Sequence, residues 1–480
     1  MSPDVRKAAR WEMNWSEVAV LDGNAVALGI AESTLMEAAG LALAEAAKEM
    51  AKGAVLVLCG PGNNGGDGFV ASRYLREWGF STAVLASHNN SRGQTAINAR
   101  DSAGEITIWP DKPEGDYSLI VDCLLGAGAG LGDSLRSPIA EVAAWARGMD
   151  VPILACDIPT GLGGPDVLTA DTTITYHSMK QGLHSSKAGE VRVSELPWPA
   201  EVEDCGPGDA KRYPRLDATA RKGDRGRLWV IGGGPYHGAP ILAGMAAARS
   251  GCDLVHVAMP SKSASRAEWP ASLIPEILPD SEMLTEDSLE AISMAFSKRG
   301  ADAVVIGPGL GRDEKTKSAV STILQMAAEI GTPVVIDADA ISALPSGKWP
   351  QGLIGVATPH AGEAERWLGE VSASQAVEGC SGEDVAIVVT GAEDLLTGPQ
   401  GRSCKATGGH PRMAVGGTGD LLAGTIGGLL AQGMPAWPAA RLGCALLRQA
   451  GARAAEQAGP GLLAEDVPVE IAKVLREWTV

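Results

Sequence analysis

The sequence contains no concentrated positive charge. Its 480 residues include 58 Asp and Glu against 40 Lys and Arg, a net charge of −18, and no block of Lys or Arg occurs. Proteins that bind nucleic acid or an anionic membrane surface need clustered positive charge next to the phosphate groups. We therefore expect no nucleic-acid partner and no membrane partner, and we attribute the acidity to solubility.

Cysteine pairs of the kind that bind metals are also missing. The eight cysteines are scattered, none forms a C-x-x-C pair, and several lie in apolar runs. This usage is typical of buried free thiols in a reducing compartment. It disfavours zinc sites and a disulfide framework.

Neither a signal peptide nor a membrane-spanning run can be recognised. Residues 1–15 are polar and mixed in charge, unlike a signal peptide. Residues 421–440 carry no charge, but their two prolines and four glycines make them a poor transmembrane helix. Together with the cysteine usage, these features predict a cytoplasmic protein.

What the sequence has instead is a series of short apolar runs that end at Gly or Asp. Such runs are typical of parallel strands buried on both faces, and helical patterns separate them. We predict strands at Ala54–Leu58, Thr82–Ala86, Leu119–Leu125, Pro152–Cys156, Thr172–Tyr176, Arg227–Ile231, Asp253–Ala258, Ala303–Ile306, Pro333–Asp337, Leu353–Ala357 and Val385–Thr390. The alternation predicts an α/β protein made of two α/β sandwiches, of which we expect the N-terminal one to have three layers.

A stretch with four prolines and no clear periodicity, Glu195 to Gly223, separates the two sets of strands. We place a domain boundary near Tyr213, which gives domains 1–212 and 213–480. Before the first strand, "STLMEAAGLALAEAAKEMA" has an apolar face at helical spacing. We expect this helix to pack on the first sheet or on a neighbouring subunit, so a homo-oligomer is the expected assembly.

The stretch "LVLCGPGNNGGDGF", residues 56–69, joins a predicted strand to a predicted helix through a loop rich in glycine. Its glycines satisfy G-x-G-x-x-G, and backbone N–H groups at a helix start favour a phosphate. A redox cofactor would also need an acidic residue after the next strand, about 20 residues on. That strand ends at Ala86, Ser87 and His88. The loop therefore predicts a phosphate site rather than a dehydrogenase, with a purely structural turn as the alternative.

Two further strands end in polar residues, at Asp122 and at Asp157 with Thr160. The carboxyl ends of neighbouring parallel strands line one crevice, so these side chains and the asparagine-rich loop are expected to converge. Their oxygens could hold a hard cation, or one carboxylate could act as an acid or base. The alternative is that each aspartate only caps the turn that follows it.

"GPGNNGGDGFVASRYL", "VDCLLGAGAG" and "DIPTGL" resemble the epimerase domain of the NAD(P)H-hydrate repair enzymes, as do the later "ADTTITYHSMKQGL" and "KAGEVRVSEL". The resemblance covers roughly residues 1–210. It implies a Rossmann-like fold that binds hydrated NADH or NADPH as a substrate and interconverts its R and S forms.

This resemblance also implies roles for individual residues. It implies a potassium ion held by Asn64 and Asp122, and proton transfer by Asp157. The phosphate loop that it implies consists of Asn63, Gly65, Gly66 and Asp67. Thr160, counted with the substrate-binding residues, stands where the family usually has Ser and keeps the hydroxyl.

In the second half, "MAVGGTGDLLAGTIGGLLAQG", residues 413–433, contains Gly416-Gly417-Thr418-Gly419-Asp420 at the start of an apolar helix. Free N–H groups there make an anion site, and Asp420 is placed to take a proton from a hydroxyl. A purely structural N-terminal Asp is the alternative. "ATPHAGEAERWLG" puts His360 and Glu363 at a strand-to-helix turn, where a capping role for the histidine is the commoner one.

The ordered set "YHGAP", "IGPGLG", "VIDADAI", "TPHAGE" and "AVGGTGDLLAG" resembles the ribokinase-like NAD(P)H-hydrate dehydratase domain, over residues 215–480. The resemblance implies that Asp420 removes a proton from the hydroxyl of the hydrate. It implies a phosphoryl site formed by Gly417, Thr418 and Gly419, and a hydrate pocket lined by Ala239, Gly309 and His360. Mg²⁺ and ADP or ATP are the implied cofactors, with ADP favoured, and NADHX and NADPHX are the implied substrates.

The sequence departs from that family at three places. Thr390 stands where a lysine is common, "ATGGHPRMA" replaces the usual loop at 408–412, and "LLRQAG" replaces a His-Gly pair in the last helix. Arg412 is our candidate substitute for the lysine. Two alternatives stay open for the second domain, a kinase for a small vitamin-like molecule and a nucleotide-binding scaffold without dehydratase activity.

Overall fold

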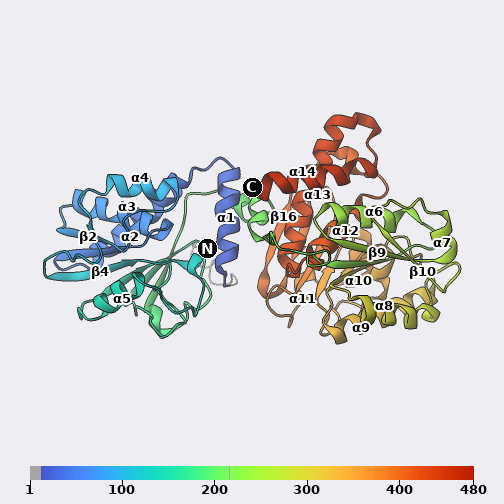
Figure 1. The fold of residues 1–480 in the computed structure, drawn as a ribbon, viewed down its shortest axis with the longest axis horizontal. Helices are drawn as coiled ribbons and strands as arrows, with labels where there is room; N and C mark the ends of the chain where they lie inside the picture. The colour runs from blue at the N-terminus through green and yellow to red at the C-terminus, as the bar shows by residue number, and fades with distance from the viewer. Residues whose placement is uncertain (1–11, 216, 480) are drawn as a thin grey trace. The chain divides into compact units, whose positions relative to one another are not determined.

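The computed structural model of the chain describes residues 12–215 and 217–479 (Figure 1). Most of the segment 1–15, on which part of the localisation prediction rested, therefore lies outside the described residues. The chain divides into two compact units, Met1–Val202 and Glu203–Val480. We call them the N-terminal and the C-terminal unit and describe each by itself.

The N-terminal unit is built on a seven-stranded sheet in the order β3-β2-β1-β4-β5-β6-β7, in which all neighbours run parallel. Its strands are β1 (Ala54–Cys59), β2 (Thr82–Ala86), β3 (Thr107–Ile108), β4 (Tyr117–Cys123), β5 (Ile153–Cys156), β6 (Thr172–Tyr176) and β7 (Glu190–Ser194). The chain leaves β1 for β2 on one side and later returns to β4 on the other. This reversal opens a crevice at the carboxyl ends of β1 and β4, where α/β proteins bind ligands.

Helices cover both faces of this sheet, as Figure 1 shows. They are α2 (Glu32–Met50), α3 (Asn63–Glu77), α4 (Gln94–Ser102) and α5 (Ile139–Arg147), whereas α1 (Trp15–Ala27) packs in a separate apolar cluster with Leu35 of α2. Leu43 of α2 and Phe69 of α3 are fully buried against one face, and Val142 of α5 is buried against the other. The predicted three-layer sandwich is confirmed.

The C-terminal unit contains a nine-stranded mixed sheet in the order β10-β9-β8-β11-β12-β13-β14-β15-β16. Its strands are β8 (Arg227–Ile231), β9 (Leu254–Pro260), β10 (Ile274–Leu278), β11 (Ala303–Ile306), β12 (Val334–Ile336), β13 (Gly355–Ala357), β14 (Val385–Val389), β15 (Asp394–Thr397) and β16 (Ser403–Ala406). From β10 to β14 the strands are parallel, whereas β15 and β16 pair antiparallel. The chain again reverses direction at its first strand, between β8 and β11.

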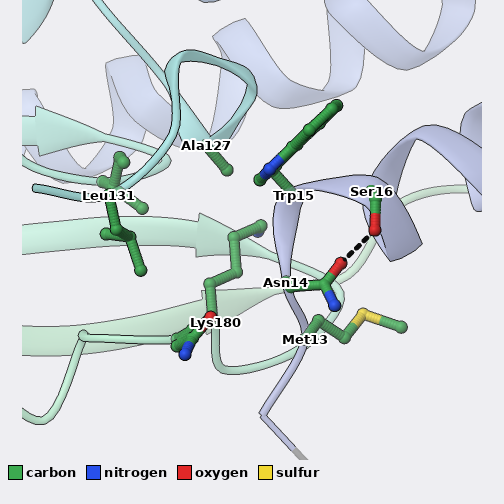
Figure 2. A pocket seen from close by; sticks show the side chains of 9 residues that line it. Met13, Asn14, Trp15, Ser16, Ala127, Leu131 and Lys180 are labelled. Carbon is green, nitrogen blue, oxygen red and sulfur yellow. Dashed lines mark hydrogen bonds between the residues drawn. The ribbon is translucent and has the colours of Figure 1, made fainter. Parts of the chain in front are cut away.

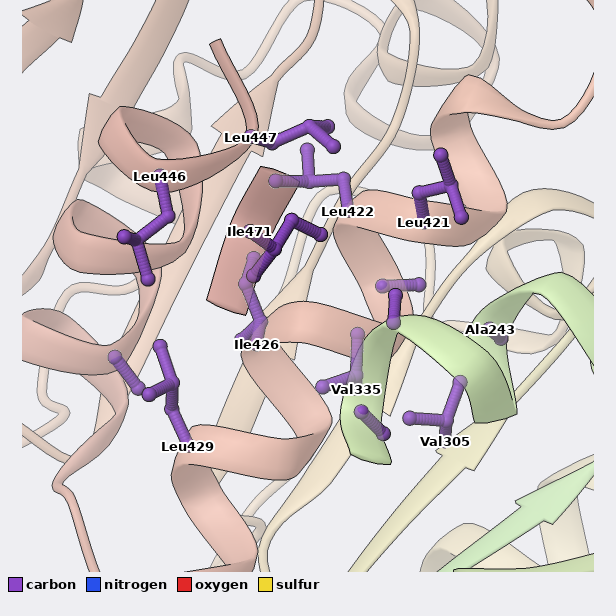
Figure 3. Packing of buried hydrophobic residues seen from close by; sticks show 14 of the residues in the cluster. Ala243, Val305, Val335, Leu421, Leu422, Ile426, Leu429, Leu446, Leu447 and Ile471 are labelled. Carbon is purple, nitrogen blue, oxygen red and sulfur yellow. The ribbon is translucent and has the colours of Figure 1, made fainter. Parts of the chain in front are cut away.

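Nine helices are described in this unit, and they lie on both faces of the sheet. They are α6 (Gly238–Arg249), α7 (Ser261–Arg266), α8 (Leu289–Arg299), α9 (Glu314–Ile330), α10 (Ala361–Leu368), α11 (Ala373–Ala376), α12 (Thr418–Ala431), α13 (Ala436–Ala458) and α14 (Val467–Thr479). Figure 3 shows Leu422 and Ile426 of α12 packed among α6, α13 and α14. A Cβ on Gly424 would lie 1.9 Å from the carbonyl oxygen of Ala243, so the small residues of α12 allow close contact with α6.

The uncharged run 421–440 is therefore core helix, divided between α12 and the start of α13. Among the residues that the structure describes, no helix is long and apolar enough to cross a membrane. The eight cysteines, all of which are described, form no disulfide.

The segment 203–212 packs within the C-terminal unit, just before the predicted boundary at Tyr213. Arg441 of α13 pairs with the buried Asp209 at 2.6 Å and also donates hydrogen bonds to the carbonyl oxygens of Glu203 and Asp204. These contacts tie the start of the unit to its longest described helix.

Candidate active sites

The glycine-rich segment after β1 becomes helical earlier than the sequence suggested. Helix α3 begins at Asn63, so residues 63–67 form its first turns rather than a loop. A Cβ on Gly60 would lie 1.8 Å from the carbonyl oxygen of Leu124, and one on Gly65 would lie 1.9 Å from that of Gly60. Only glycine fits these approaches, which bring the N-terminus of α3 to the crevice beside β4.

A turn after β4, residues 124–127, contacts predicted residues from two strand ends. The backbone N–H of Leu124 donates to Asp122 at 3.2 Å, and that of Ala127 donates to Asp157 at 2.7 Å. Between them, the N–H of Leu125 donates to the Thr160 hydroxyl at 3.0 Å. The structure thus brings the ends of β4 and β5 together, as the sheet topology requires.

Asp122 is fully buried and is held by Thr160. Its two oxygens accept from the Thr160 hydroxyl and the Thr160 backbone N–H, each at 2.8 Å. Burial raises the pKa of Asp122 to about 6, although these hydrogen bonds work in the opposite direction. The hydroxyl is therefore the feature that matters at position 160, and Thr supplies it as Ser would.

Asn64 reaches the same turn from α3. A Cβ on Gly126 would lie 3.1 Å from Oδ1 of Asn64 and 2.8 Å from Oδ2 of Asp157, so both side chains crowd against this glycine. The buried Nδ2 of Asn64 has no hydrogen-bond partner among the described residues. Buried polar groups are normally paired, so this amide has capacity left for a ligand.

Asp157 forms an ion pair that sequence reasoning missed. Its Oδ1 lies 2.8 Å from Nζ of Lys180, which is 3% exposed. The same ammonium donates to the Thr175 hydroxyl at 2.8 Å and the Tyr176 carbonyl at 2.9 Å, so its three donors are used. Lys180 lies within "HSMKQGL", but a single lysine after a strand gives no signal by residue type alone.

A cavity of about 630 Å³ opens at these strand ends, a size typical of small-molecule sites. Asn63, Asn64, Asp67 and Asp157 line it, whereas the predicted residues Gly65, Gly66, Asp122 and Thr160 do not. An adjoining cavity of about 260 Å³ shares Lys180 and is bordered by Trp15 at the start of α1 (Figure 2).

Two further carboxyl groups give this cavity an acidic character. Burial, and then the charge of Asp157, raise the pKa of Asp67 well above its usual value. Burial also raises the pKa of Asp22 to about 6, with Asp157 adding to the effect and Lys180 opposing it. The carboxyl groups of Asp67, Asp22 and Asp157 therefore interact electrostatically in this cavity, and both raised pKa values reflect burial first and neighbouring negative charge second.

In the C-terminal unit, the G-G-T-G-D segment begins α12 as predicted. Gly417 is the N-cap with φ of +99°, and a Cβ there would lie 2.5 Å from Cδ1 of Leu242. A Cβ on Gly416 or Gly419 would meet no atom within 4 Å, so open space lies over the helix N-terminus. The Thr418 hydroxyl donates to the carbonyl of Met413 at 2.7 Å, which fixes the approach to the helix.

Three aspartates interact beside this helix N-terminus. Burial, and then the charge of Asp339, raise the pKa of Asp420 to about 6. Burial and the charge of Asp420 raise the pKa of Asp337 to about 8, against a 2.7 Å hydrogen bond from the Thr358 hydroxyl. Strand β12 ends just before Asp337, so the parallel sheet brings these groups to the first turn of α12.

The other predicted residues of this unit follow the carboxyl ends of β8, β11 and β13. Ala239 is the second residue of α6, and Gly309 approaches Tyr236 so closely that a Cβ would lie 2.2 Å from its carbonyl oxygen. His360 caps α10, since its Nδ1 accepts from Gly362 at 3.0 Å. The ring of His360 is more than half exposed, which leaves Nε2 accessible.

The structure also places two of the positions at which the sequence departs from the dehydratase family, Thr390 and the segment 408–412. Thr390 pairs with His360 in a parallel bridge, and its N–H donates to the Pro359 carbonyl at 2.9 Å. In the segment 408–412, the exposed Arg412 donates its N–H to Nδ1 of His410 at 3.0 Å. The position of the missing lysine is thus beside a predicted hydrate-pocket residue.

Comparisons with known proteins cover both units. Residues 32–182 match the family model described as YjeF-related protein N-terminus, and residues 228–473 match NAD(P)H-hydrate dehydratase. The chain is 33% identical to a bifunctional NAD(P)H-hydrate repair enzyme of Hyperthermus butylicus, over 96% of this chain and 91% of that one. A relative of the same description from Escherichia coli is 35% identical over 81% of this chain and 78% of its own. The chain is also similar to the solved ADP/ATP-dependent NAD(P)H-hydrate dehydratase of Bacillus subtilis, at 24% identity over 56% of this chain and 96% of that one, with a TM-score of 0.46.

Proposed function

The chain belongs to the family of bifunctional NAD(P)H-hydrate repair enzymes, and on this premise we propose how its residues carry out the two reactions. The N-terminal domain interconverts the R and S hydrates of NADH and NADPH. The C-terminal domain dehydrates the S hydrate and restores NAD(P)H. The protein is therefore an isomerase and a lyase in one chain.

For the epimerase, we propose Asp157 as the proton-transfer group. Protonation of the hydroxyl on C6 of the hydrate lets it leave as water, and water added to the other face then loses a proton to give the other epimer. We assign the protonation of the leaving hydroxyl and the removal of the proton from the added water to this one group. The observation that carries this role is the position of Asp157 on the cavity wall, with Lys180 beside it.

We propose that the substrate phosphates bind at the start of α3, at Asn63, Gly65, Gly66 and Asp67. The helix N-terminus favours an anion, because its first backbone N–H groups have no partner within the helix. Thr160 supports this site through the turn that follows β4.

We further propose a potassium ion held by Asn64 and Asp122. The side chains supply amide and carboxylate oxygens, the ligands that hard cations prefer, and Oδ1 of Asn64 faces Gly126 in the turn that also holds Asp122. The ion would neutralise the buried carboxylate and offset part of the negative charge of the substrate. Metal binding of this kind is testable by the potassium dependence of epimerisation.

For the dehydratase, we propose Asp420 as the base that removes the proton from the hydroxyl of the hydrate. That oxygen then takes the terminal phosphoryl group of ADP or ATP, and departure of phosphate with loss of a proton from C5 restores NAD(P)H. With ADP the other products are AMP and phosphate. The open N-terminus of α12 and the raised pKa of Asp420 support this role.

We assign the phosphoryl group to Gly417, Thr418 and Gly419, and the hydrate to a pocket formed by Ala239, Gly309 and His360. ADP is the favoured nucleotide. Bound Mg²⁺ would neutralise the nucleotide phosphates. Arg412 would supply the positive charge that Thr390 lacks, and unchanged nucleotide affinity in Arg412→Ala would reject this assignment.

We also propose a homo-oligomer in the cytoplasm. The apolar side chains of Trp15, Val26 and Leu28, on α1 and directly after it, are about half exposed and suit a contact between subunits. The eight unbonded cysteines suit a reducing compartment.

The decisive experiment gives the purified protein a mixture of R and S hydrates, with ADP, with ATP or with neither. Complete recovery of NADH absorbance with a nucleotide supports both activities. Asp420→Asn should abolish dehydration and leave epimerisation intact. A stable phosphorylated product seen by mass spectrometry would instead support a small-molecule kinase, and no reaction with either nucleotide would support a scaffold.

A further inference from the structure

Helix α13 contains two buried arginines about two turns apart, and each is tied to a different segment of the C-terminal unit. Arg441 pairs with Asp209 and the segment before β8. Arg448, which is 8% exposed, pairs with Asp394 at the start of β15. The proposed reaction has no role for either residue.

Arg448 uses all five of its N–H donors. Nε and Nη2 reach the two carboxylate oxygens of Asp394 at 2.8 and 2.7 Å. Nη1 donates to the carbonyls of Ala392 and Gly408 at 2.8 and 2.9 Å, and Nη2 donates to that of Gly391 at 3.0 Å. A guanidinium has five donors in a fixed planar arrangement, whereas a lysine ammonium has three on a flexible chain, so no other side chain could make this set of contacts.

These contacts join two separate segments of the chain. Residues 391–394 form the turn directly after Thr390, which pairs with His360. Gly408 is followed by Gly409, and both have positive φ, so the chain turns sharply where Arg448 holds it. The segment then continues through His410 and Arg412 toward α12.

A second contact on α13 supports the same segment, one turn beyond Arg448. A Cβ on Gly451 would lie 2.3 Å from Cε of Met413, so Met413 packs directly against the helix backbone. The carbonyl of Met413 in turn accepts the Thr418 hydroxyl at 2.7 Å. A continuous series of contacts therefore leads from α13 through residues 408–413 to the N-terminus of α12.

We propose that Arg448 is a positioning residue for nucleotide binding, which fixes residues 391–394 and 408–413 around the phosphoryl site at the start of α12. The proposal rests on the nucleotide site proposed at Gly417, Thr418 and Gly419. Arg448 acts through these segments and does not touch the nucleotide. It places the loop that carries Arg412, the positive charge that we assign to the phosphates.

The test compares Arg448→Lys with Arg441→Lys in the full-length protein. Both remove a forked ion pair from the same helix, so both should lower the thermal midpoint. Arg448→Lys should raise the KM for ADP and for ATP by about tenfold and change the KM for the hydrate and the kcat by less than about twofold. Arg441→Lys should leave the nucleotide KM within about twofold of the unchanged protein.

A double variant tests whether Arg448 acts through Arg412. If it does, the nucleotide KM of Arg412→Ala with Arg448→Lys should be no higher than that of the worse single variant, because groups in one network are not additive. Gly451→Ala displaces Met413 by another route and should also raise the nucleotide KM. Gly451→Ala therefore still tests the proposal if Arg448→Lys does not fold.

Equal nucleotide KM values in both lysine variants, or independent effects of positions 412 and 448, would overturn the proposal. Asp420→Asn serves as the separate test of the site itself. If that variant still dehydrates the hydrate, the proposed reaction fails regardless of Arg448. If it is inactive and Arg448→Lys binds nucleotide normally, the positioning role alone fails.

Discussion

Asp420 lies close to a second carboxylate, Asp339, and this neighbour contributes after burial to its pKa of about 6. A base must be deprotonated to accept a proton. We therefore expect kcat/KM for dehydration to fall as the pH drops below about 6, in a profile measured with saturating nucleotide. Asp339→Asn removes the like charge, so the fall in kcat/KM should then begin at a lower pH. An unchanged pH profile would mean that a group other than Asp420 titrates.

Lys180 forms an ion pair with Asp157 at the cavity wall, and its replacement should affect one reaction only. Lys180→Met leaves the Asp157 carboxylate without its partner, which costs about 3–5 kcal/mol when a buried pair is broken. We expect a marked loss of epimerisation and unchanged dehydration of pure S hydrate. Lys180→Arg keeps the charge and should retain more epimerase activity. Equal loss in both variants would point to packing rather than charge.

The site could be predicted from the sequence where the fold dictates proximity. Parallel strands end at one edge, so Asp122, Asp157 and Thr160 were expected to meet, and the turn at 124–127 brings them together. Lys180 could not be predicted this way, because it belongs to the irregular segment after β6. The contacts of Arg448 could not be predicted from the sequence either, because they join segments that are far apart along the chain.

Among the elements, α12 is packed so closely that added volume has a predictable effect. Gly424→Ala would place its Cβ 1.9 Å from the Ala243 carbonyl and force α6 and α12 apart. We expect a loss of about 1–3 kcal/mol of stability, measured by denaturant unfolding. Gly419→Ala, on the same helix but facing open space, should keep its stability and instead alter nucleotide KM. Similar stability losses in the two variants would contradict this packing.

Most strands could be predicted because they are apolar runs that end at Gly or Asp. The central strands β1, β4, β8 and β11 were of this kind. The sequence pattern does not predict β3, β7, β10 and β16, which are edge strands, nor β15, which lies beside an edge, because strands there need not be apolar on both faces. The start of α3 was placed too late, since glycines that usually mark a loop here allow close approach inside a helix.

At the scale of the whole molecule, the hydrate can diffuse from the epimerase site of one protein to the dehydratase site of another. We therefore expect two variants, each inactive at one site, to complement each other. Asp157→Asn should consume only the S hydrate, apart from spontaneous epimerisation, and Asp420→Asn should consume neither while still interconverting them. An equal mixture of the two proteins with nucleotide should restore NADH from both epimers. Chiral separation of the remaining hydrates measures this, and failure of the mixture would show that the two reactions must occur within one chain.

The contacts between Arg441 and residues 203–209 determine where the chain can be divided into two separately encoded proteins. A C-terminal protein that began at residue 213 would leave the Arg441 guanidinium inside the core without Asp209 or the two carbonyls that surround it. A cut between Val202 and Glu203 keeps these partners. We therefore expect a C-terminal half that begins at Glu203 to fold stably by itself, and one that begins at residue 213 to be less stable.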